Sequence, residues 1–297
     1  MKLGEEMNEF ETIYNTYRSH LFSIAYRMLG SISDAEDIVH EVFLHITQIN
    51  IEQITDLKAY LSKMTNNRCL NLLQSARHRR ETYVGPWLPE PKIQTLDQPF
   101  EKIIKDESIS YAFLLLLEQL SPIERSVFVL RETLAYDYNE IANILDKTEV
   151  NCRKIFSRAK RKLNGVTSTS LTNSKQVDLL TKTFIQASVT GNFDQFINTL
   201  TEDVVLVTDG GGKVIAALNP IISKQRVSAF LQGIASKGSF YGELQPIIIN
   251  GQSGVLHVQD GQPLKAIYFA LDQTETNIKK IYIISNPDKL RHISLPL

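Results

Sequence analysis

The sequence predicts a multidomain protein with two all-α segments followed by an α+β domain. Apolar residues recur at helical spacing through most of residues 8–80 and 107–165. From residue 175 to residue 297, one amphipathic helix precedes short alternating runs rich in β-branched residues. Strands that follow helices as a block indicate an α+β domain rather than a parallel βαβ fold. A proline-rich linker, residues 81–106, and a polar linker, Asn164–Ser174, separate the three parts.

The first all-α segment is expected to hold three helices. The second of them begins after Gly30, where Ser33 and Glu36 form a capping box. The third runs from about Leu57 through Arg77. The apolar spacing of the first helix comes from Phe10, Ile13, Tyr14, Tyr17 and Leu21.

The second all-α segment contains the pattern of a helix-turn-helix. The sequences "SPIE" (Ser121–Glu124) and "DYNE" (Asp137–Glu140) are capping boxes, and Pro122 stands where a missing N–H costs nothing. A break at Asp146–Lys147 separates a short helix from a basic one that starts near Thr148. Two short capped helices joined by a tight turn are typical of a DNA-binding helix-turn-helix.

The basic helix divides into an apolar and a cationic side. In this interpretation, early side chains reach base edges and later ones neutralise phosphates. The alternative is a solvated helix whose cations complement its C-terminal dipole, but that explains only the last turn. The core side is expected to hold Val150, Ile155, Ala159 and Leu163, and the DNA side Arg153, Lys154, Arg158, Lys160 and Arg161.

Bulk composition excludes some classes of protein. The formal net charge is -1, yet seven Lys or Arg against one Glu lie between Lys147 and Lys162, and local patches decide nucleic-acid binding. The sequence shows neither a membrane-length apolar run nor a secretion signal, so we expect a cytoplasmic protein without a membrane contact. Cys69 and Cys152 fit neither a disulfide framework nor a metal site, and no cofactor is expected.

Two long motifs resemble a known family. "DAEDIVHEVF" (Asp34–Phe43) and "LSPIERSVFVLRETLAYDYNEIANIL" are similar to bacterial extracytoplasmic-function sigma factors, the promoter-specificity subunits of RNA polymerase. The resemblance places sigma region two at Phe10–Arg80 and region four at Ser110–Leu163. "YVGPWLPEP" and "DGGGK" resemble the subgroup with a fused C-terminal SnoaL-like domain, which implies an NTF2-like α+β cone.

The resemblance assigns partners to three surfaces. Core RNA polymerase would bind the "DAEDIVHEVF" helix, where Asp34, Asp37 and Glu41 share one stripe; a merely solvated acidic face is the alternative. Promoter DNA would meet the helix from Thr148 at the "-35" element. At the "-10" element, the resemblance implies Asn67 for recognition and the arginines Arg77, Arg79 and Arg80 for phosphates.

The C-terminal domain is expected to regulate in cis. "DGGGK" is not a phosphate loop, because Lys213 opens the strand pattern "KVIAAL" rather than a helix. It is either a hairpin turn or bare backbone against which a partner packs. The resemblance favours an intramolecular partner, and an unknown small ligand in the cone could shift the balance. The expected interdomain residues are Tyr83, Trp87, Pro89, Asp209, Gly210, Gly211, Gly212 and Lys213.

Two other functions remain open from the residues alone. One is a helix-turn-helix transcriptional regulator with a ligand-sensing C-terminal domain. The other is an enzyme, for which His257, Asp260, Asp209 and His292 are the candidates; their spacing does not force them together, and a hydrogen-bonded structural role is expected for His257. We therefore expect no catalytic residues.

Overall fold

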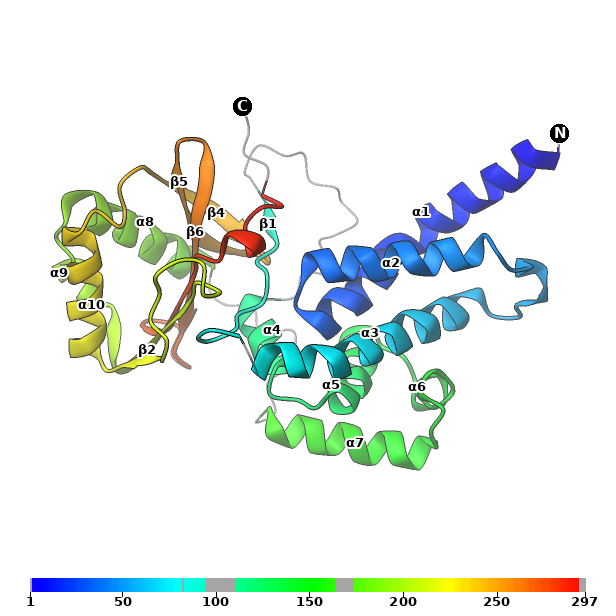
Figure 1. Cartoon of the computed structure of the whole chain (residues 1–297). Helices are drawn as coiled ribbons and strands as arrows, with labels where there is room; N and C mark the ends of the chain where they lie inside the picture. Colours follow the sequence, from blue (N-terminus) through cyan, green and yellow to red (C-terminus); the bar gives the residue numbers. More distant parts are fainter. Residues whose placement is uncertain (1, 82, 95–109, 164–173, 294–297) are drawn as a thin grey trace. The chain divides into compact units, whose positions relative to one another are not determined.

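The chain divides into two compact units, and the proline-rich segment belongs to the second. The computed structural model describes residues 2–81, 83–94, 110–163 and 174–293 (Figure 1). Unit 1 comprises Met1–Glu81 and Phe113–Ser168, and unit 2 comprises Thr82–Ala112 and Thr169–Leu297. The described part of the predicted linker, residues 83–94, is thus built into the C-terminal domain.

Unit 1 is helical throughout its described residues. Its elements are α1 (Lys2–Leu29), α2 (Ile32–Ile46), η1 (Ile51–Gln53), α3 (Leu57–Glu81), α5 (Pro122–Phe128), the π-helical turn η3 (Val129–Thr133), α6 (Tyr138–Leu145) and α7 (Glu149–Lys162). The short helix α4 (Tyr111–Leu117) crosses the boundary, so Tyr111 belongs to unit 2. No helix among the described residues has both the length and the apolarity needed to span a bilayer.

Local signals set most helix ends in unit 1. The capping boxes at Ser121 and Asp137 are both present and confirm the prediction. The expected cap at Ser33 is wrong. Gly30 takes a positive φ of 67°, the chain enters extended geometry at Ser31, and the Ser31 hydroxyl accepts from the Asp34 N–H at 3.2 Å. The helix α2 therefore begins at Ile32.

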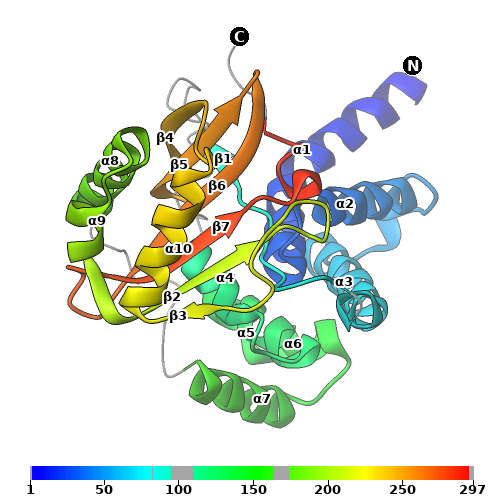
Figure 2. The same cartoon turned by 60° about the vertical axis from the view of Figure 1, so that its left-hand side comes forward.

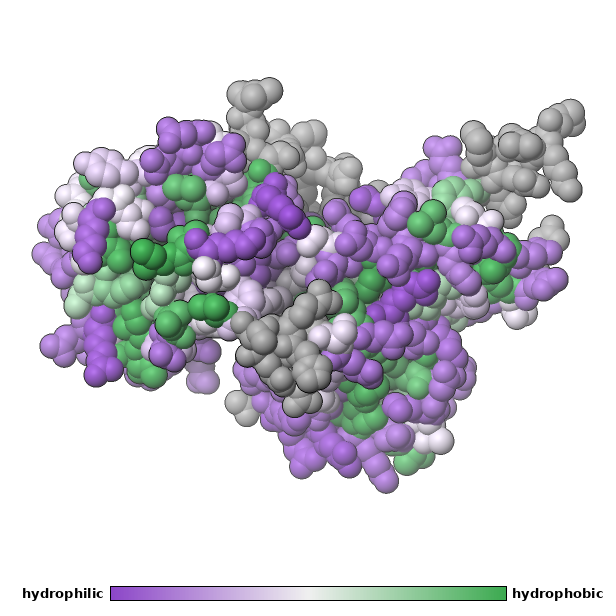
Figure 3. Space-filling view, viewed as in Figure 1, coloured by the Kyte–Doolittle hydropathy of each residue, from purple (hydrophilic) through white to green (hydrophobic). Residues whose placement is uncertain are grey.

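The helix-turn-helix is α6 and α7. Asp146 ends α6 in the left-handed conformation (φ 50°, ψ 50°), and the Thr148 side chain caps α7. Ile155 is buried as expected, and Ala159 and Leu163 are too. The prediction for Val150 is wrong, because this side chain is 62% exposed. The surface that α7 forms along the lower edge of Figure 3 is mostly hydrophilic.

Unit 2 is built on one mixed sheet with the order β1-β4-β5-β6-β7-β2-β3. Among the strand pairs that the structure describes, β2 and β7 run parallel and the others are antiparallel. Figure 2 shows the three helices α8 (Ser174–Thr190), α9 (Asp194–Asn198) and α10 (Lys224–Ser236) on one face of this sheet. The elements are β1 (Ile93–Gln94), α8 (Ser174–Thr190), α9 (Asp194–Asn198), β2 (Leu200–Asp209), β3 (Ile221–Ile222), α10 (Lys224–Ser236), β4 (Glu243–Ile249), β5 (Gln252–Gln259), β6 (Gln262–Leu271), β7 (Ile278–Ile284) and η4 (Pro287–Lys289).

The space between these helices and the sheet holds the core of unit 2. Aromatic rings fill it at centroid distances between 5.0 and 6.4 Å. Side chains alternate between the two faces of a strand, so Ile267 and Phe269 of β6 point into this core. Tyr268 between them packs on the opposite face against Tyr111 and Tyr282. The five core phenylalanines are Phe184, Phe193, Phe196, Phe240 and Phe269.

Candidate functional site

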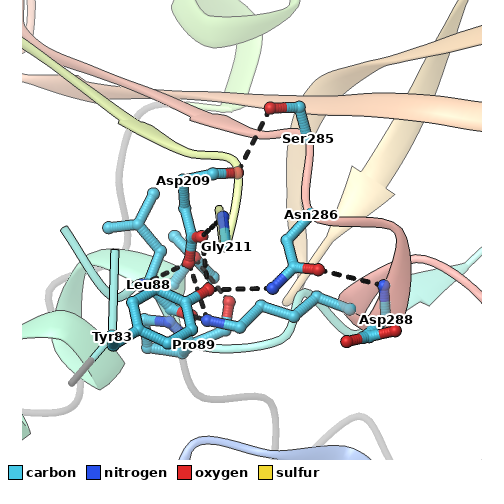
Figure 4. A network of polar contacts seen from close by, with 10 residues as sticks. Tyr83, Leu88, Pro89, Asp209, Gly211, Ser285, Asn286 and Asp288 are labelled. Atoms are coloured by element: carbon cyan, nitrogen blue, oxygen red, sulfur yellow. Dashed lines mark hydrogen bonds and ion pairs between the residues drawn. The ribbon is translucent and has the colours of Figure 1, made fainter. Parts of the chain in front are cut away.

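The side chain of Asp209, at the end of β2, binds the proline-rich segment to the sheet of unit 2 (Figure 4). Its Oδ1 accepts from the Tyr83 hydroxyl at 2.6 Å and from the Gly211 N–H at 3.0 Å. Its Oδ2 accepts from the Leu88 N–H at 2.8 Å and from Lys289 Nζ at 2.7 Å. These four donors match the acceptor capacity of an ionised carboxylate. We call Asp209, Lys289 and the groups bonded to them the Asp209 hub.

Lys289 of η4 supplies the cation of the hub. Its side chain is 7% exposed and that of Asp209 is 0% exposed, so the ion pair is buried. The Lys289 ammonium also donates to the Leu88 carbonyl and lies 4.2 Å from the centroid of the Trp87 ring. The backbone of Leu88 is therefore bonded through its N–H to the carboxylate and through its C=O to the ammonium.

Tyr83 links the hub to Asn286, which follows β7. Its hydroxyl accepts from Asn286 Nδ2 at 2.8 Å while it donates to Asp209. Burial and the hydrogen bond to Asp209 raise the pKa of Tyr83, so the phenol keeps its proton and its role as donor. The Asp209 carbonyl accepts from the backbone of Ser285 and Asn286, which fixes the end of β7 beside the end of β2.

The glycines of "DGGGK" make room for this hub. A Cβ on Gly211, which has a φ of 60°, would lie 2.2 Å from Asn286 Nδ2. A Cβ on Gly210 would lie 2.3 Å from the Val214 carbonyl oxygen. Gly212 lies against Val84 of the proline-rich segment. The partners that approach this backbone are thus within unit 2, and Lys213 pairs with Asp288 at 2.6 Å.

The expected strand "KVIAAL" is absent from the structure, which corrects that prediction. Residues 211–213 form a turn, and Val214 bonds back to the Gly210 carbonyl. The chain rejoins the sheet only at β3, beside β2. Ala217 of this run lies beside β2, but its N–H and C=O bond the Thr208 hydroxyl instead of the β2 backbone, so no ladder forms there.

A second attachment joins the proline-rich segment to the sheet. Ile93 and Gln94 pair antiparallel with Ile249 and Ile248 as the edge strand β1. Asn250 holds Lys92 from both sides, donating its N–H to the Lys92 carbonyl and accepting the Lys92 N–H on its side chain. The segment adds a strand to the C-terminal domain, a mode in which main-chain bonds supply much of the binding.

The same unit also holds the residue that leads into the second helical segment. The Tyr111 hydroxyl donates to the Pro89 carbonyl at 2.7 Å, and its ring lies 5.1 Å from the ring of Tyr268. Tyr111 is fully buried. Unit 2 therefore holds residues 83–94 and Tyr111, near both ends of the segment that connects α3 to α5.

The acidic stripe of α2 forms one wall of a groove in unit 1. Asp34, Asp37 and Glu41 are exposed and line a groove of about 550 Å³ between α2 and α3. Ile38 and Leu72 contribute apolar surface to it. The residues that line it from α3 are Arg68, Asn71, Leu72 and Ser75, and Arg68 Nε pairs with Glu41 at 3.2 Å. We call this the acidic groove.

The predicted DNA-facing residues divide between described and undescribed side chains. Asn67 is exposed on α3, while its neighbour Asn66 is buried and accepts from the Ser126 hydroxyl at 2.6 Å. The cationic residues predicted on α7 are all exposed, namely Arg153, Lys154, Arg158, Lys160 and Arg161. The side chains of Arg77, Arg79 and Arg80 lie outside the described residues.

Tyr138 positions Arg153, a role that the sequence pattern does not indicate. The Arg153 guanidinium lies 4.4 Å from the centroid of the Tyr138 ring, and its Nη2 is 3.1 Å from Glu149. The Arg131 guanidinium lies 4.8 Å from the same centroid. An Arg held by an aromatic ring and a carboxylate loses less conformational freedom when it meets a ligand.

The two helical segments of unit 1 pack against each other through polar contacts. The Tyr136 hydroxyl lies 2.7 Å from both His20 Nε2 and the Ser62 hydroxyl. Arg125, which is buried, donates to the Met28 carbonyl at 2.7 Å and pairs with Glu118. These contacts join α1 and α3 to α5, η3 and α6. We call this the closed interface.

His20 makes the closed interface sensitive to pH. Burial, followed by the charges of Lys58 and Arg27, lowers the pKa of His20 to about 4. The unfolded chain, with a pKa near 6.5, binds this proton more readily, so stability falls as the pH drops from about 6.5 towards 4. From about pH 7.5 to about pH 5 the loss from this group should be about 2 kcal/mol.

We expect His20→Gln to remove this part of the pH dependence. Urea unfolding followed by circular dichroism, at about pH 7.5 and about pH 5, measures it. The wild-type protein should lose about 2 kcal/mol more than the variant. Tyr136→Phe is the matched control, because it weakens the same contact yet leaves the titrating group in place. Equal pH dependence in wild type and His20→Gln would contradict the assignment.

The candidates for catalysis have other partners. His257 is buried, and its Nε2 lies 2.6 Å from the Tyr241 carbonyl, so the expected hydrogen bond is present. Burial lowers the pKa of His257. Asp209 lies on β2, which β6 and β7 separate from β5, and it belongs to the hub. His292 bonds the Pro91 carbonyl, and Asp260 is exposed in a turn.

Comparison with known proteins identifies the class of the helical segments. Residues 13–79 match sigma-70 region 2, and residues 110–163 match sigma-70 region 4. The two segments joined by the closed interface are therefore the two promoter-recognition regions of a sigma-70-type sigma factor.

Relatives over the full length narrow the class to one family. The chain is 31% identical to "ECF RNA polymerase sigma factor SigJ" of Mycobacterium tuberculosis, covering 96% of this chain and 93% of that protein. It is 28% identical to "Probable ECF RNA polymerase sigma factor SigI" of the same species, covering 93% of each. The crystal structure of Mycobacterium tuberculosis SigJ matches with a TM-score of 0.76 at 27% identity, covering 96% of this chain and 99% of that one.

The chain belongs to the extracytoplasmic-function (ECF) RNA polymerase sigma factors. This confirms the family and the fold class predicted from the sequence, including the C-terminal SnoaL-like α+β domain.

Proposed function

We propose that this sigma factor directs core RNA polymerase to promoters and that its C-terminal domain regulates it in cis by holding the linker between regions 2 and 4. The Asp209 hub carries the second part. A buried ion pair of the C-terminal domain binds the linker backbone at Leu88, and the linker continues as an edge strand of the same sheet. Whatever loosens this attachment changes how far apart regions 2 and 4 can move.

Core polymerase is the proposed occupant of the acidic groove. Three exposed carboxylates on one wall, with apolar surface from Ile38 and Leu72, suit a basic partner segment that also buries apolar side chains. Opposite charge raises the rate of encounter, and apolar contact slows dissociation. The pairing of Arg68 with Glu41 leaves Asp34 and Asp37 as the carboxylates most available to the partner.

Binding both promoter elements requires the closed interface to open. The "-35" and "-10" elements lie about 25 base pairs apart, or about 85 Å of B-form DNA at ~3.4 Å per base pair. In unit 1, Lys63 on α3 pairs with Asp146, immediately before α7, at 2.5 Å. Lys63 is one turn before Asn67, and Asp146 is four residues before Val150. The two DNA-facing helices are therefore much too close to reach both elements of straight DNA.

Regions 2 and 4 exchange between a closed and an open form. In the closed form, regions 2 and 4 cover each other; in the open form, they face the polymerase and the promoter. Polymerase and promoter shift the equilibrium because they bind the open form better. The C-terminal domain limits the open form to distances that the attached linker permits, and the tether makes even a weak attachment effective.

In vitro transcription from a promoter library, with purified core polymerase added or omitted, tests the proposal. Selected promoters should carry two elements, and both specific binding and transcription should depend on core polymerase. A helix-turn-helix regulator would instead bind one element without it. Specific promoter binding by the isolated chain, with no response to core polymerase, would contradict the proposal.

A further inference from the structure

The exposed Val150 on α7 has no structural role that explains it. The side chain is 62% exposed, whereas the apolar side of α7, at Cys152, Ile155 and Ala159, is buried. A β-branched residue is a poorer helix former than alanine, and here burial does not compensate for that. A single exposed valine is common on protein surfaces, so its meaning depends on its position.

Val150 stands at the centre of the outward face of α7. At 100° per residue, it points directly away from Ala159, the middle of the buried side. The residues in line with it on successive turns are polar or cationic and exposed, namely Lys154, Ser157 and Arg161. It is also the second residue of the helix after the Thr148 cap, in the turn that reaches base edges when such a helix enters the major groove.

We propose that Val150 reads a thymine of the "-35" element through the 5-methyl group of that base. The inference rests on the proposed promoter-binding role of α7. Only thymine presents a methyl group in the major groove, and an apolar side chain is its ordinary partner. Arg153, oriented by Tyr138 and Glu149, lies one turn further along α7, and Lys154 lies four residues on; these cations take the neighbouring base edges or phosphates.

Replacement of single thymines by deoxyuridine tests this contact, since uracil lacks only the methyl group. The experiment uses the full chain with core polymerase and the promoter selected from the library, and it measures the affinity for each substituted promoter. For the wild-type protein, one position in the "-35" element should lose about three- to fivefold in affinity, the effect of one buried methyl group. In Val150→Ala, the same substitution should have a clearly smaller effect, because the shorter side chain leaves less apolar surface for the methyl group.

A second exposed valine serves as the control for Val150. Val189→Ala removes a valine of α8 that is also exposed, at 74%, and should keep the wild-type response. If no thymine responds although Arg153→Ala and Lys154→Ala weaken "-35" binding, the inference about Val150 fails and the proposed function stands. An equal response in Val150→Ala and wild type also overturns the inference. If substitutions in α7 leave promoter binding unchanged, both fail.

Discussion

Asp209→Ala should destabilise the C-terminal unit by about 3–5 kcal/mol, because it removes one partner of a buried ion pair. Lys289 would lose this carboxylate while it keeps its contacts with the Leu88 carbonyl and the rings of Trp87 and Tyr83. The Leu88 N–H and the Tyr83 hydroxyl would also lose their acceptor. Unlike an exposed pair, this one has no water to replace the lost partner.

The lone tryptophan reports this change directly. In the wild-type protein, Trp87 lies beside Lys289 in the attached linker, so its fluorescence should shift to longer wavelength when the hub is lost. Urea unfolding followed by Trp87 emission gives the stability. The matched control is Asp203→Ala on the same strand, which breaks an exposed ion pair with Lys279 and should change little. Equal unfolding curves for the two variants would refute the role of the hub.

Asp37→Lys should weaken the binding of core polymerase by about 100-fold, since it places a cation in the acidic groove against a basic partner. Like charges at an interface cost several kcal/mol. Asp37 suits the test better than Asp34, which lies in the first turn of α2 where a negative charge stabilises the helix. The loss should diminish as salt concentration rises.

Glu36→Lys is the matched control for the groove. It makes the same charge change one residue away, on an exposed part of α2 that does not line the groove. Titration of labelled core polymerase with each variant measures the affinity. If Asp37→Lys and Glu36→Lys bind alike, the long-range field of the helix matters and the groove does not.

Local sequence signals predicted the parts of the fold that local chemistry decides. The caps at Ser121, Asp137 and Thr148 need only side chains three residues apart, so the helix-turn-helix could be placed correctly. The helix α10 was missed although Ser223 caps it and Val227 and Leu231 share one face. That signal was present in the sequence. The two-residue strand β1, between proline-rich and undescribed residues, has no periodicity from which it could be predicted.

The candidate site was only partly predictable, because tertiary contacts complete it. The motifs indicated Tyr83, Trp87 and Asp209, and the structure brings them together. Lys289 and Asn286 lie about 80 residues beyond Asp209, in a stretch without a recognisable motif. They enter the hub because β7 runs beside β2. Val150 shows the opposite failure. Its apolar character predicted burial, but its phase on α7 places it opposite the buried face.

The dependence of transcription on promoter spacing tests the central claim most directly. Promoters that differ by single base pairs between the "-35" and "-10" elements are transcribed with core polymerase and either wild type, Asp203→Ala or Asp209→Ala. With the linker attached, wild type and Asp203→Ala should share one narrow optimum. With the hub lost, whether or not the C-terminal unit stays folded, Asp209→Ala should accept a broader range of spacings. An unchanged narrow optimum in Asp209→Ala would show that the C-terminal domain does not set the distance between regions 2 and 4.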